Sequence, residues 1–234
     1  MRTTAIVVGA GRGTRMRTAT AKAFLTLGGV PIAVHSLRAL SRVREIHSIV
    51  CVISADRQAQ GAEMLQHYGP WQPPVQLACG GLERQDSVAA GLAQVGGGSD
   101  LVLVHDAARP FVSVDAVRAC IQTAAAAGAA ILAVPACDTL KLVDAGVTVV
   151  NTIDRRKVWL AQTPQVFRVG LLRRAYEQAQ RDGYVGTDDA ALVERIHTPV
   201  RIVPGTPTNR KITTPADLRW AEWYLETQGV PGSC

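Results

Sequence analysis

Short apolar runs alternate along this sequence with longer amphipathic segments, and this alternation limits the fold more than any other feature. The runs are rich in Val, Ile and Leu, show little alternation of polar and apolar residues, and span residues 5–8, 49–53, 75–78, 101–104 and 129–134. Strands buried on both faces have this composition. The segments between them suit helices and span residues 32–40, 57–68, 84–95 and 114–127. Strands alternating with helices predict an α/β fold with a mostly parallel central sheet.

The pattern changes after Pro135. Two strand-like stretches, 140–143 and 147–153, flank the turn residues Asp144-Ala145-Gly146 and predict a β-hairpin that projects from the body. A further strand is expected near 158–160, ahead of Gln162-Thr163-Pro164-Gln165. The remaining elements expected are helices at 170–181, 188–195 and 215–226 and a strand at 200–203. We therefore expect one domain over residues 1–234, with a hairpin arm at about 138–155.

Composition and charge narrow the class of function. The chain has 47% hydrophobic and 19% charged residues, which is typical of a folded globular protein and excludes a wholly disordered one. Its net charge of +6 favours anionic ligands, but the basic residues are dispersed and few aromatic residues accompany them. This pattern predicts a phosphorylated small molecule as the ligand and no nucleic acid.

Terminal and cysteine patterns predict a cytoplasmic protein. The first apolar run is too short for a signal peptide, and no stretch approaches the length of a membrane span. The five cysteines are odd in number and include no C-x-x-C pair, so neither a zinc site nor a disulfide framework is expected.

A glycine-rich loop follows the first predicted strand. Gly9, Gly11 and Gly13 allow the backbone to approach a ligand closely, and exposed N–H groups there can hold phosphate. Thr14 stands where a dinucleotide-binding fingerprint needs its third glycine, and no phosphate-loop lysine follows. Arg15 and Lys22 across this loop suit a triphosphate. The alternative is a tight turn whose two cations face solvent.

A second candidate nucleotide segment follows the third predicted strand. Gly80-Gly81 ends the strand and Arg84 begins a helix, with Ser87 in its first turn. The hydroxyl of Ser87 suits either an unpaired helix N–H or a bound base. Simple capping of the helix, with Glu83 favoured by the helix dipole, is the alternative.

The third candidate segment is His105-Asp106-Ala107-Ala108-Arg109-Pro110, directly after a buried strand. Ligands of open α/β sheets bind beyond the carboxyl ends of strands. We expect Asp106 to hold Mg²⁺, the small alanines to leave room and Arg109 to bind a phosphate or carboxylate. The alternatives are a turn capped by Asp106 and paired with Arg109, and a structural role for His105.

These segments, in this order, resemble the 2-C-methyl-D-erythritol 4-phosphate cytidylyltransferase family of the non-mevalonate isoprenoid pathway. The similarity covers nearly the whole chain, because it continues through Asp138-Thr139-Leu140-Lys141, Thr152-Ile153-Asp154-Arg155, Gln162-Thr163-Pro164-Gln165, Thr187-Asp188-Asp189-Ala190 and Lys211-Ile212-Thr213. The resemblance implies a Rossmann-like nucleotidyltransferase fold and a homodimer in which the hairpin arm clasps the partner subunit.

The resemblance also implies an activity and its residues. The activity is transfer of CMP from CTP to 2-C-methyl-D-erythritol 4-phosphate, giving 4-diphosphocytidyl-2-C-methyl-D-erythritol and pyrophosphate, with Mg²⁺ or another divalent cation. We expect Arg15 and Lys22 to be catalytic. CTP would be bound by Ala10, Gly11, Gly13, Gly81, Leu82, Arg84 and Ser87. The acceptor would be bound by Asp106, Arg155, Thr163 and Lys211, and from the partner subunit by Arg109, Thr139 and Lys141.

The chain departs from many members of the family near the loop. Ala21 and Ala23 stand where proline and glutamine flank the loop lysine, and Gly9-Ala10 replaces Ala-Ala before the glycine loop. Loss of the proline should loosen the loop that holds Lys22. No second domain is expected, so the fused bifunctional form of some relatives is not predicted.

The expected chemistry is direct attack of the acceptor's ionised phosphate on the α-phosphorus of CTP, which requires no general base. Three other functions stay open on the sequence. One is a cytidylyltransferase for ribitol 5-phosphate or another polyol phosphate. The second is an NAD(P)-dependent dehydrogenase, for which only Asp56 lies near the position of the ribose-binding acid. The third is a nucleotide-sensing module without catalysis.

Overall fold

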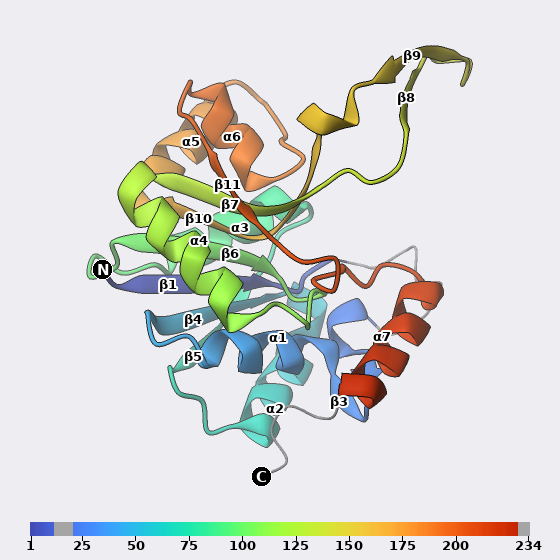
Figure 1. The fold of residues 1–234 in the computed structure, drawn as a ribbon. Coiled ribbons are helices and arrows are strands. Elements are labelled where there is room, and N and C mark those ends of the chain that lie inside the picture. Colours follow the sequence, from blue (N-terminus) through green and yellow to red (C-terminus); the bar gives the residue numbers. More distant parts are fainter. Residues whose placement is uncertain (12–20, 229–234) are drawn as a thin grey trace.

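A seven-stranded sheet forms the centre of the computed structural model, which describes residues 1–11 and 21–228 (Figure 1). The strand order is β11-β7-β10-β6-β1-β4-β5, and every neighbouring pair is parallel except the two that involve β10. The strands are β1 (Thr3–Val8), β4 (Ile46–Ile53), β5 (Val75–Cys79), β6 (Leu101–Asp106), β7 (Ala129–Pro135), β10 (Trp159–Arg168) and β11 (Arg201–Pro204). The mostly parallel sheet predicted from the buried apolar runs is confirmed.

Helices cover both faces of this sheet and enclose two apolar cores. On one face pack α1 (Ile32–Ser41), α2 (Gln58–Tyr68) and α4 (Val114–Ala127). On the other pack α3 (Arg84–Ala93), α5 (Val169–Arg181) and α6 (Asp189–Arg195). These bounds lie within two residues of the predicted ones. Within the described part of the chain, no helix is both long and apolar enough to cross a membrane.

A third, smaller cluster forms around α7 (Pro215–Gln228). Its helix begins as predicted, because the Thr214 hydroxyl accepts the N–H of Asp217 at 3.2 Å. The same cluster includes a small hairpin that the sequence analysis did not predict, β2 (Thr26–Leu27) with β3 (Val30–Pro31). Gly28 and Gly29 connect these strands with φ of 57° and 76°, the left-handed conformations that a two-residue hairpin turn needs.

The strand predicted near residues 158–160 is present, but it is longer than predicted, and its predicted end before Gln162 was wrong. β10 continues to Arg168, through Gln162-Thr163-Pro164-Gln165, and lies antiparallel between β6 and β7. Its pairing with β7 shifts in register between Ala161 and Gln165. Such an irregularity tolerates proline, which cannot donate to a sheet ladder.

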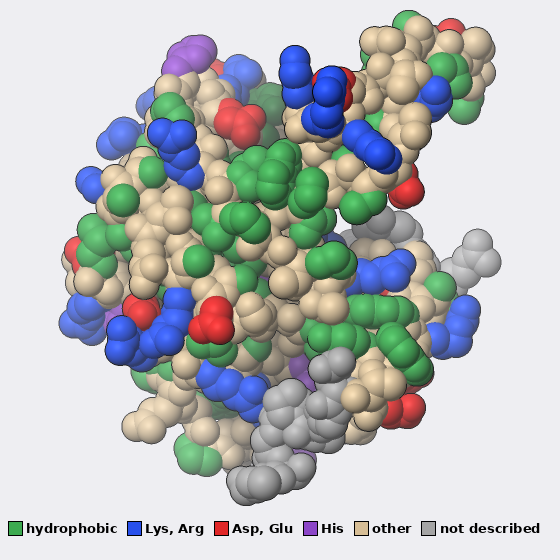
Figure 2. Space-filling view, in the orientation of Figure 1, with side chains coloured by type: hydrophobic (Ala, Val, Ile, Leu, Met, Phe, Trp, Pro, Cys, Tyr) green, Lys and Arg blue, Asp and Glu red, His purple; other side chains and the backbone are tan. Residues whose placement is uncertain are grey.

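The predicted hairpin is present as an arm that projects from the body (Figure 1). β8 (Leu140–Val143) pairs antiparallel with β9 (Val149–Ile153), and all of β9 is exposed. The short helical turn η4 (Arg155–Lys157) stands at its foot. Figure 2 shows basic side chains gathered there, where η4 supplies Arg155, Arg156 and Lys157.

Candidate active site

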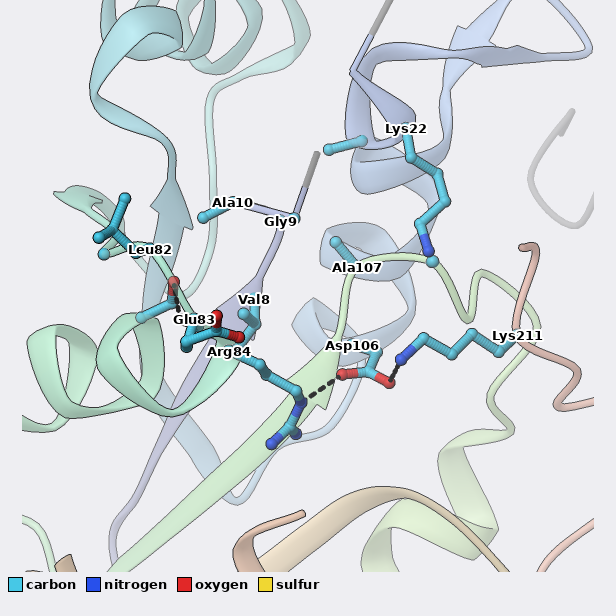
Figure 3. Close-up of a pocket in the computed structure, with 15 residues that line it drawn as sticks. Val8, Gly9, Ala10, Lys22, Leu82, Glu83, Arg84, Asp106, Ala107 and Lys211 are labelled. Atoms are coloured by element: carbon cyan, nitrogen blue, oxygen red, sulfur yellow. Dashed lines mark hydrogen bonds and ion pairs between the residues drawn. The ribbon is translucent and has the colours of Figure 1, made fainter. Parts of the chain in front are cut away.

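A pocket of about 280 Å³ opens at the carboxyl ends of β1 and β6. The strand order reverses here, because β4 and β5 extend from one side of β1 and β6 lies on the other. Ligands of doubly wound folds bind at such a point. Val8 and Asp106 are register partners, so the loops that follow them leave the sheet together. The lining residues are Val8, Gly9, Ala10, Gly11, Lys22, Ala23, Gly81, Leu82, Glu83, Arg84, Ser87, Asp106, Ala107, Ala108 and Lys211 (Figure 3).

One wall of the pocket depends on a close approach between two chain segments. A Cβ atom on Gly80 would lie 2.5 Å from the Cβ of Ala10 and 2.8 Å from the Oγ of Ser87, so any side chain there would push the segments apart. Glu83 and Asp86 form a capping box at the start of α3, and the Ser87 hydroxyl donates to the Glu83 carbonyl at 3.1 Å. Capping therefore takes place at this segment, and Glu83 and Ser87 also line the pocket.

Asp106 is the charged centre of the opposite wall. Its carboxylate pairs with Nζ of Lys211 at 2.6 Å and with Nε of Arg84 at 3.2 Å, from opposite sides in Figure 3. Nε of Arg109 lies 3.9 Å away. Burial alone would raise the pKa of this carboxyl, but the three cations together hold it well below its usual range. Asp106 therefore stays ionised, and its charge is balanced by the protein.

His105 has the structural role that the sequence analysis gave as an alternative. The Thr163 hydroxyl accepts the backbone N–H of Asp106, so its own hydrogen is available to Nδ1 of His105 at 3.2 Å. Nε2 then donates to the carbonyl of Arg109 at 3.1 Å. Burial lowers the pKa of this imidazole to about 4. A neutral ring with both nitrogens bonded is not a general base.

The structure brings most of the predicted nucleotide residues into this one pocket. They are Ala10, Gly11, Lys22, Gly81, Leu82, Arg84 and Ser87, together with Asp106 and Lys211 from the predicted acceptor site. Gly13 and Arg15 lie outside the described residues, as does most of the loop that the loss of proline was expected to loosen. Ala23, one of the two departures from the family pattern, is buried and lines the pocket.

Two predicted acceptor residues lie behind the pocket wall and not in its lining. Thr163 is 4% exposed and its hydroxyl is bonded within the protein. Arg109 donates from Nη1 to the Asn209 carbonyl at 2.7 Å and lies beside Asp106. The expectation that Arg109 reaches a partner's substrate stays a prediction.

The other predicted acceptor residues lie at the arm. Lys141 donates to the Thr152 hydroxyl at 2.7 Å, across the two strands of the hairpin. Arg155 donates to the Cys137 carbonyl at the arm's foot. Neither they nor Thr139 line the pocket of their own chain.

Sequence reasoning missed a second buried carboxylate close to the pocket. Asp189 accepts from Nη2 of Arg84 at 2.9 Å and from the Tyr176 hydroxyl at 2.6 Å. The motif Thr187-Asp188-Asp189-Ala190 was noted, but no spacing rule connects it with Arg84, which lies 105 residues earlier.

Comparison with known proteins gives the family. The model of the family "2-C-methyl-D-erythritol 4-phosphate cytidylyltransferase" matches residues 3–227. The chain belongs to this family. The protein of that name from Acidobacterium capsulatum is 42% identical over 96% of this chain and 98% of its own length. The one from Geobacillus kaustophilus is 44% identical over 96% of this chain and 97% of its own.

Solved structures agree with this cytidylyltransferase family. The crystal structure of 4-diphosphocytidyl-2C-methyl-D-erythritol synthase from Anaerococcus prevotii superposes with a TM-score of 0.85 at 32% identity, over 96% of both chains. The Rossmann-like nucleotidyltransferase fold is confirmed, and the protein is an enzyme of the nucleotidyltransferase class. Family membership displaces the dehydrogenase interpretation, and Asp56 is not among the residues that line the pocket.

Proposed function

We propose that this pocket is where the enzyme transfers CMP from CTP to 2-C-methyl-D-erythritol 4-phosphate, giving 4-diphosphocytidyl-2-C-methyl-D-erythritol and pyrophosphate. The observation that carries the proposal is the convergence of Lys22, Lys211 and Arg84 with the backbone of Gly9–Gly11 and Gly81 in one cleft. Positively charged side chains that face exposed backbone N–H groups across a cleft suit the phosphates of a nucleotide. Family membership supplies the chemistry.

The reaction needs positioning more than proton transfer. A phosphate oxygen of the acceptor forms a bond to the α-phosphorus of CTP, and the bond from that phosphorus to the bridging oxygen breaks as pyrophosphate leaves. The attacking phosphate is already ionised at neutral pH, and His105 is buried and fully bonded. The enzyme therefore works by holding two anions together and stabilising the charge that develops.

Lys22 is the cation that we assign to the developing charge, together with Arg15. Lys211 and Arg84 pair with Asp106 on the wall of the same pocket. Lys22 lines the pocket and lies across it from Leu82 (Figure 3). The nucleotide's triphosphate would lie between Lys22 and the wall that Gly81 and Leu82 form.

The residues present fit Mg²⁺ at Asp106 if the ion takes the place of Lys211 or Arg84, because both oxygens of this carboxylate pair with those cations. Among the described residues no cluster of three His, Cys, Asp or Glu side chains could hold a metal by itself. Mg²⁺ is commonly held by one or two carboxylates and the substrate's phosphates, and Asp106 offers such a carboxylate beside the proposed phosphate position. Bound there, the ion would neutralise charge on the triphosphate.

Selection of cytosine over other bases is also part of the proposal. We assign the choice of base to the wall formed by Ala10, Gly81, Leu82 and Ser87, which we expect to be too narrow for a purine. Carbonyl groups along this wall would accept from the base's amino group, which uracil lacks.

The direct test is release of pyrophosphate from CTP and methylerythritol phosphate in the presence of Mg²⁺. We expect turnover with this acceptor, little with ribitol 5-phosphate, and much less with ATP, GTP or UTP than with CTP. Activity should disappear with a chelator and return with added Mg²⁺. Preferred use of ribitol 5-phosphate would show that this polyol phosphate is the acceptor. Equal use of UTP and CTP would refute the proposal that this wall selects cytosine. Absence of turnover despite CTP binding would favour a sensing module.

A homodimer formed through the arm is part of the proposal. A two-stranded hairpin is marginal alone, and this one exposes the apolar residues Leu142, Val143, Val147, Val149, Val150 and Ile153. A second copy of the chain would bury them and bring Thr139 and Lys141 toward its acceptor. The cytoplasmic location stays a prediction that cell fractionation can check.

A further inference from the structure

Arg84 joins two buried carboxylates that come from distant parts of the chain. Its guanidinium donates from Nε to Asp106 on β6 and from Nη2 to Asp189 on α6, at 3.2 and 2.9 Å. The two carboxylates thereby use separate nitrogens of one planar group. The side chain of Asp189 is 1% exposed, so its charge depends on partners within the protein.

Asp189 is itself fixed from three directions. Tyr176 on α5 donates its hydroxyl to Oδ1 at 2.6 Å, while Arg84 occupies Oδ2. Gln165 on β10 accepts the backbone N–H groups of Asp189 and Ala190 at 3.1 and 3.0 Å. Burial, with the charge of Asp189 next, raises the pKa of Tyr176 above its usual range, so this hydroxyl keeps its proton and remains a donor.

The charges along this path alternate and end in the pocket. They run from Asp189 to Arg84, to Asp106 and then to Lys211, with each neighbouring pair within 3.2 Å. Of these four, all but Asp189 line the pocket. Asp189 therefore touches no ligand in the pocket, yet it sets the position of a residue that does.

We propose that Asp189, held by Tyr176, is a positioning residue of the transfer reaction: it orients Arg84 so that Arg84 fixes Asp106 and, through Asp106, Lys211. Without the bond to Asp189, one side of the guanidinium loses its partner and Arg84 can turn toward Asp106 or the substrate's phosphates. The inference rests on the proposed function of the pocket and adds residues to it.

The loss should fall on the acceptor more than on CTP. Asp106 and Lys211 lie across the pocket from Ala10 and Leu82, the wall proposed for the nucleotide base (Figure 3). A misplacement of about 1 Å can lower a rate by about 100-fold. We expect Asp189→Asn to lower kcat/KM for the acceptor by about 10- to 100-fold and to raise the dissociation constant for CTP, measured by calorimetry, by a smaller factor, because Arg84 also belongs to the proposed CTP site.

A double-mutant cycle separates positioning from general damage to the fold. If Asp189 acts through Asp106, the loss caused by Asp189→Asn should shrink to about twofold or less in an Asp106→Asn background. Asp182→Asn is the matched control, because Asp182 pairs with Arg195 at 2.8 Å on the surface and outside the pocket. It should leave kcat/KM unchanged. A loss in the Asp189 variant that equals the control's, or that persists undiminished in the Asp106 background, would overturn the proposal.

Tyr176→Phe serves if Asp189→Asn does not fold. It removes one hydrogen bond and keeps the ion pair, so a smaller loss of about three- to tenfold is expected, with the same dependence on Asp106. Unchanged kcat/KM in this variant would also count against the proposal. A wild-type enzyme that releases no pyrophosphate would instead refute the proposed function. The coupling between Asp189 and Arg84 would then still be measurable as a non-additive change in the denaturation midpoint without substrate.

Discussion

At the scale of single residues, the pocket contains a buried carboxylate whose partners also line it. Asp106 is buried and balanced by Arg84, Lys211 and Arg109. Ion pairs of this kind keep their geometry because each partner would be left uncompensated without the other. Lys22 lines the same pocket, and we expect its loss to affect the chemistry most directly.

We expect Lys22→Ala to lower kcat by about 100- to 1,000-fold, by analogy with the loss of an oxyanion donor, and to raise KM for CTP far less. The reason is that charge on the α-phosphate and on the leaving pyrophosphate grows on the way to the transition state. Steady-state pyrophosphate release measures both parameters. Arg44→Ala, which removes an exposed cation remote from the pocket, is the control. Turnover near that of the wild type would exclude Lys22 as a catalytic group.

His105 should make stability depend on pH. Its pKa is about 4 in the folded protein and about 6.5 when unfolded, so the unfolded chain binds the proton more tightly. The free energy of unfolding that depends on neutral His105 is fully present above pH 6.5. It falls as the pH drops toward 4, by up to about 3 kcal/mol for this buried group. Urea denaturation between pH 8 and 4 measures it. His105→Gln should flatten this dependence, and an equal slope in both proteins would contradict the assignment.

At the scale of elements, the sequence predicts the helices and strands whose positions depend on the local spacing of apolar residues. The buried runs and the helices between them were located within a few residues, because burial on both faces and helical periodicity leave a local pattern. The full length of β10 was not predicted. Pro164 in the middle of a sequence segment indicates the end of a strand, and the register shift opposite β7 that accommodates it cannot be seen in the sequence. The same limit applies to the site: the segments around Gly11, Gly81 and Asp106 are local motifs, whereas the pairing of Arg84 with Asp189 is made by the fold.

Two helical glycines give a paired test of packing. A Cβ atom on Gly91 in α3 would lie 2.5 Å from Cγ2 of Ile6 and 3.1 Å from Cγ2 of Val52, whereas one on Gly170 in α5 would meet nothing within 4 Å. We expect Gly91→Ala to destabilise the protein by about 1–3 kcal/mol, because overpacking exceeds the gain in helix propensity. Gly170→Ala should stabilise it by up to about 1 kcal/mol. The free energy of unfolding in urea measures both, and equal effects would contradict the packing of α3 on the sheet.

The arm provides the test of association. Val150→Asp places a charge on an exposed strand of the hairpin, and Val185→Asp places the same charge on an equally exposed position of the body. We expect the first to yield monomers at micromolar concentration and the second to leave a dimer, because only the arm would be buried between copies. Analytical ultracentrifugation measures this. A wild-type protein that sediments as a monomer would refute the dimer.

At the scale of the whole molecule, the pocket joins parts of the chain that are far apart in sequence. Its lining comes from β1, η2 (Lys22–Phe24), α3, β6 and the segment before α7. A ligand that contacts all of them binds the folded state alone, so it should stabilise the entire fold and not one element.

We therefore expect CTP with Mg²⁺ to raise the midpoint of thermal unfolding. At 100 times its dissociation constant the added stability is about 2.7 kcal/mol. ATP and GTP at the same concentration should give a smaller shift, because we assign the preference for a pyrimidine to the wall at Ala10 and Gly81. Differential scanning calorimetry measures the shift. An equal shift with all nucleotides would show that the triphosphate alone is recognised.

The place of β10 between β6 and β7 governs how the chain can be made. β7 pairs with β10 and β11, both of which follow it in sequence, so during synthesis it has no neighbour in the sheet until the ribosome has released the chain through Arg168. The nascent protein then presents open edges on both β6 and β7, which are templates for aggregation. The arm is translated within this same interval. β10, the strand that joins β6 to β7, is therefore synthesised directly after the arm.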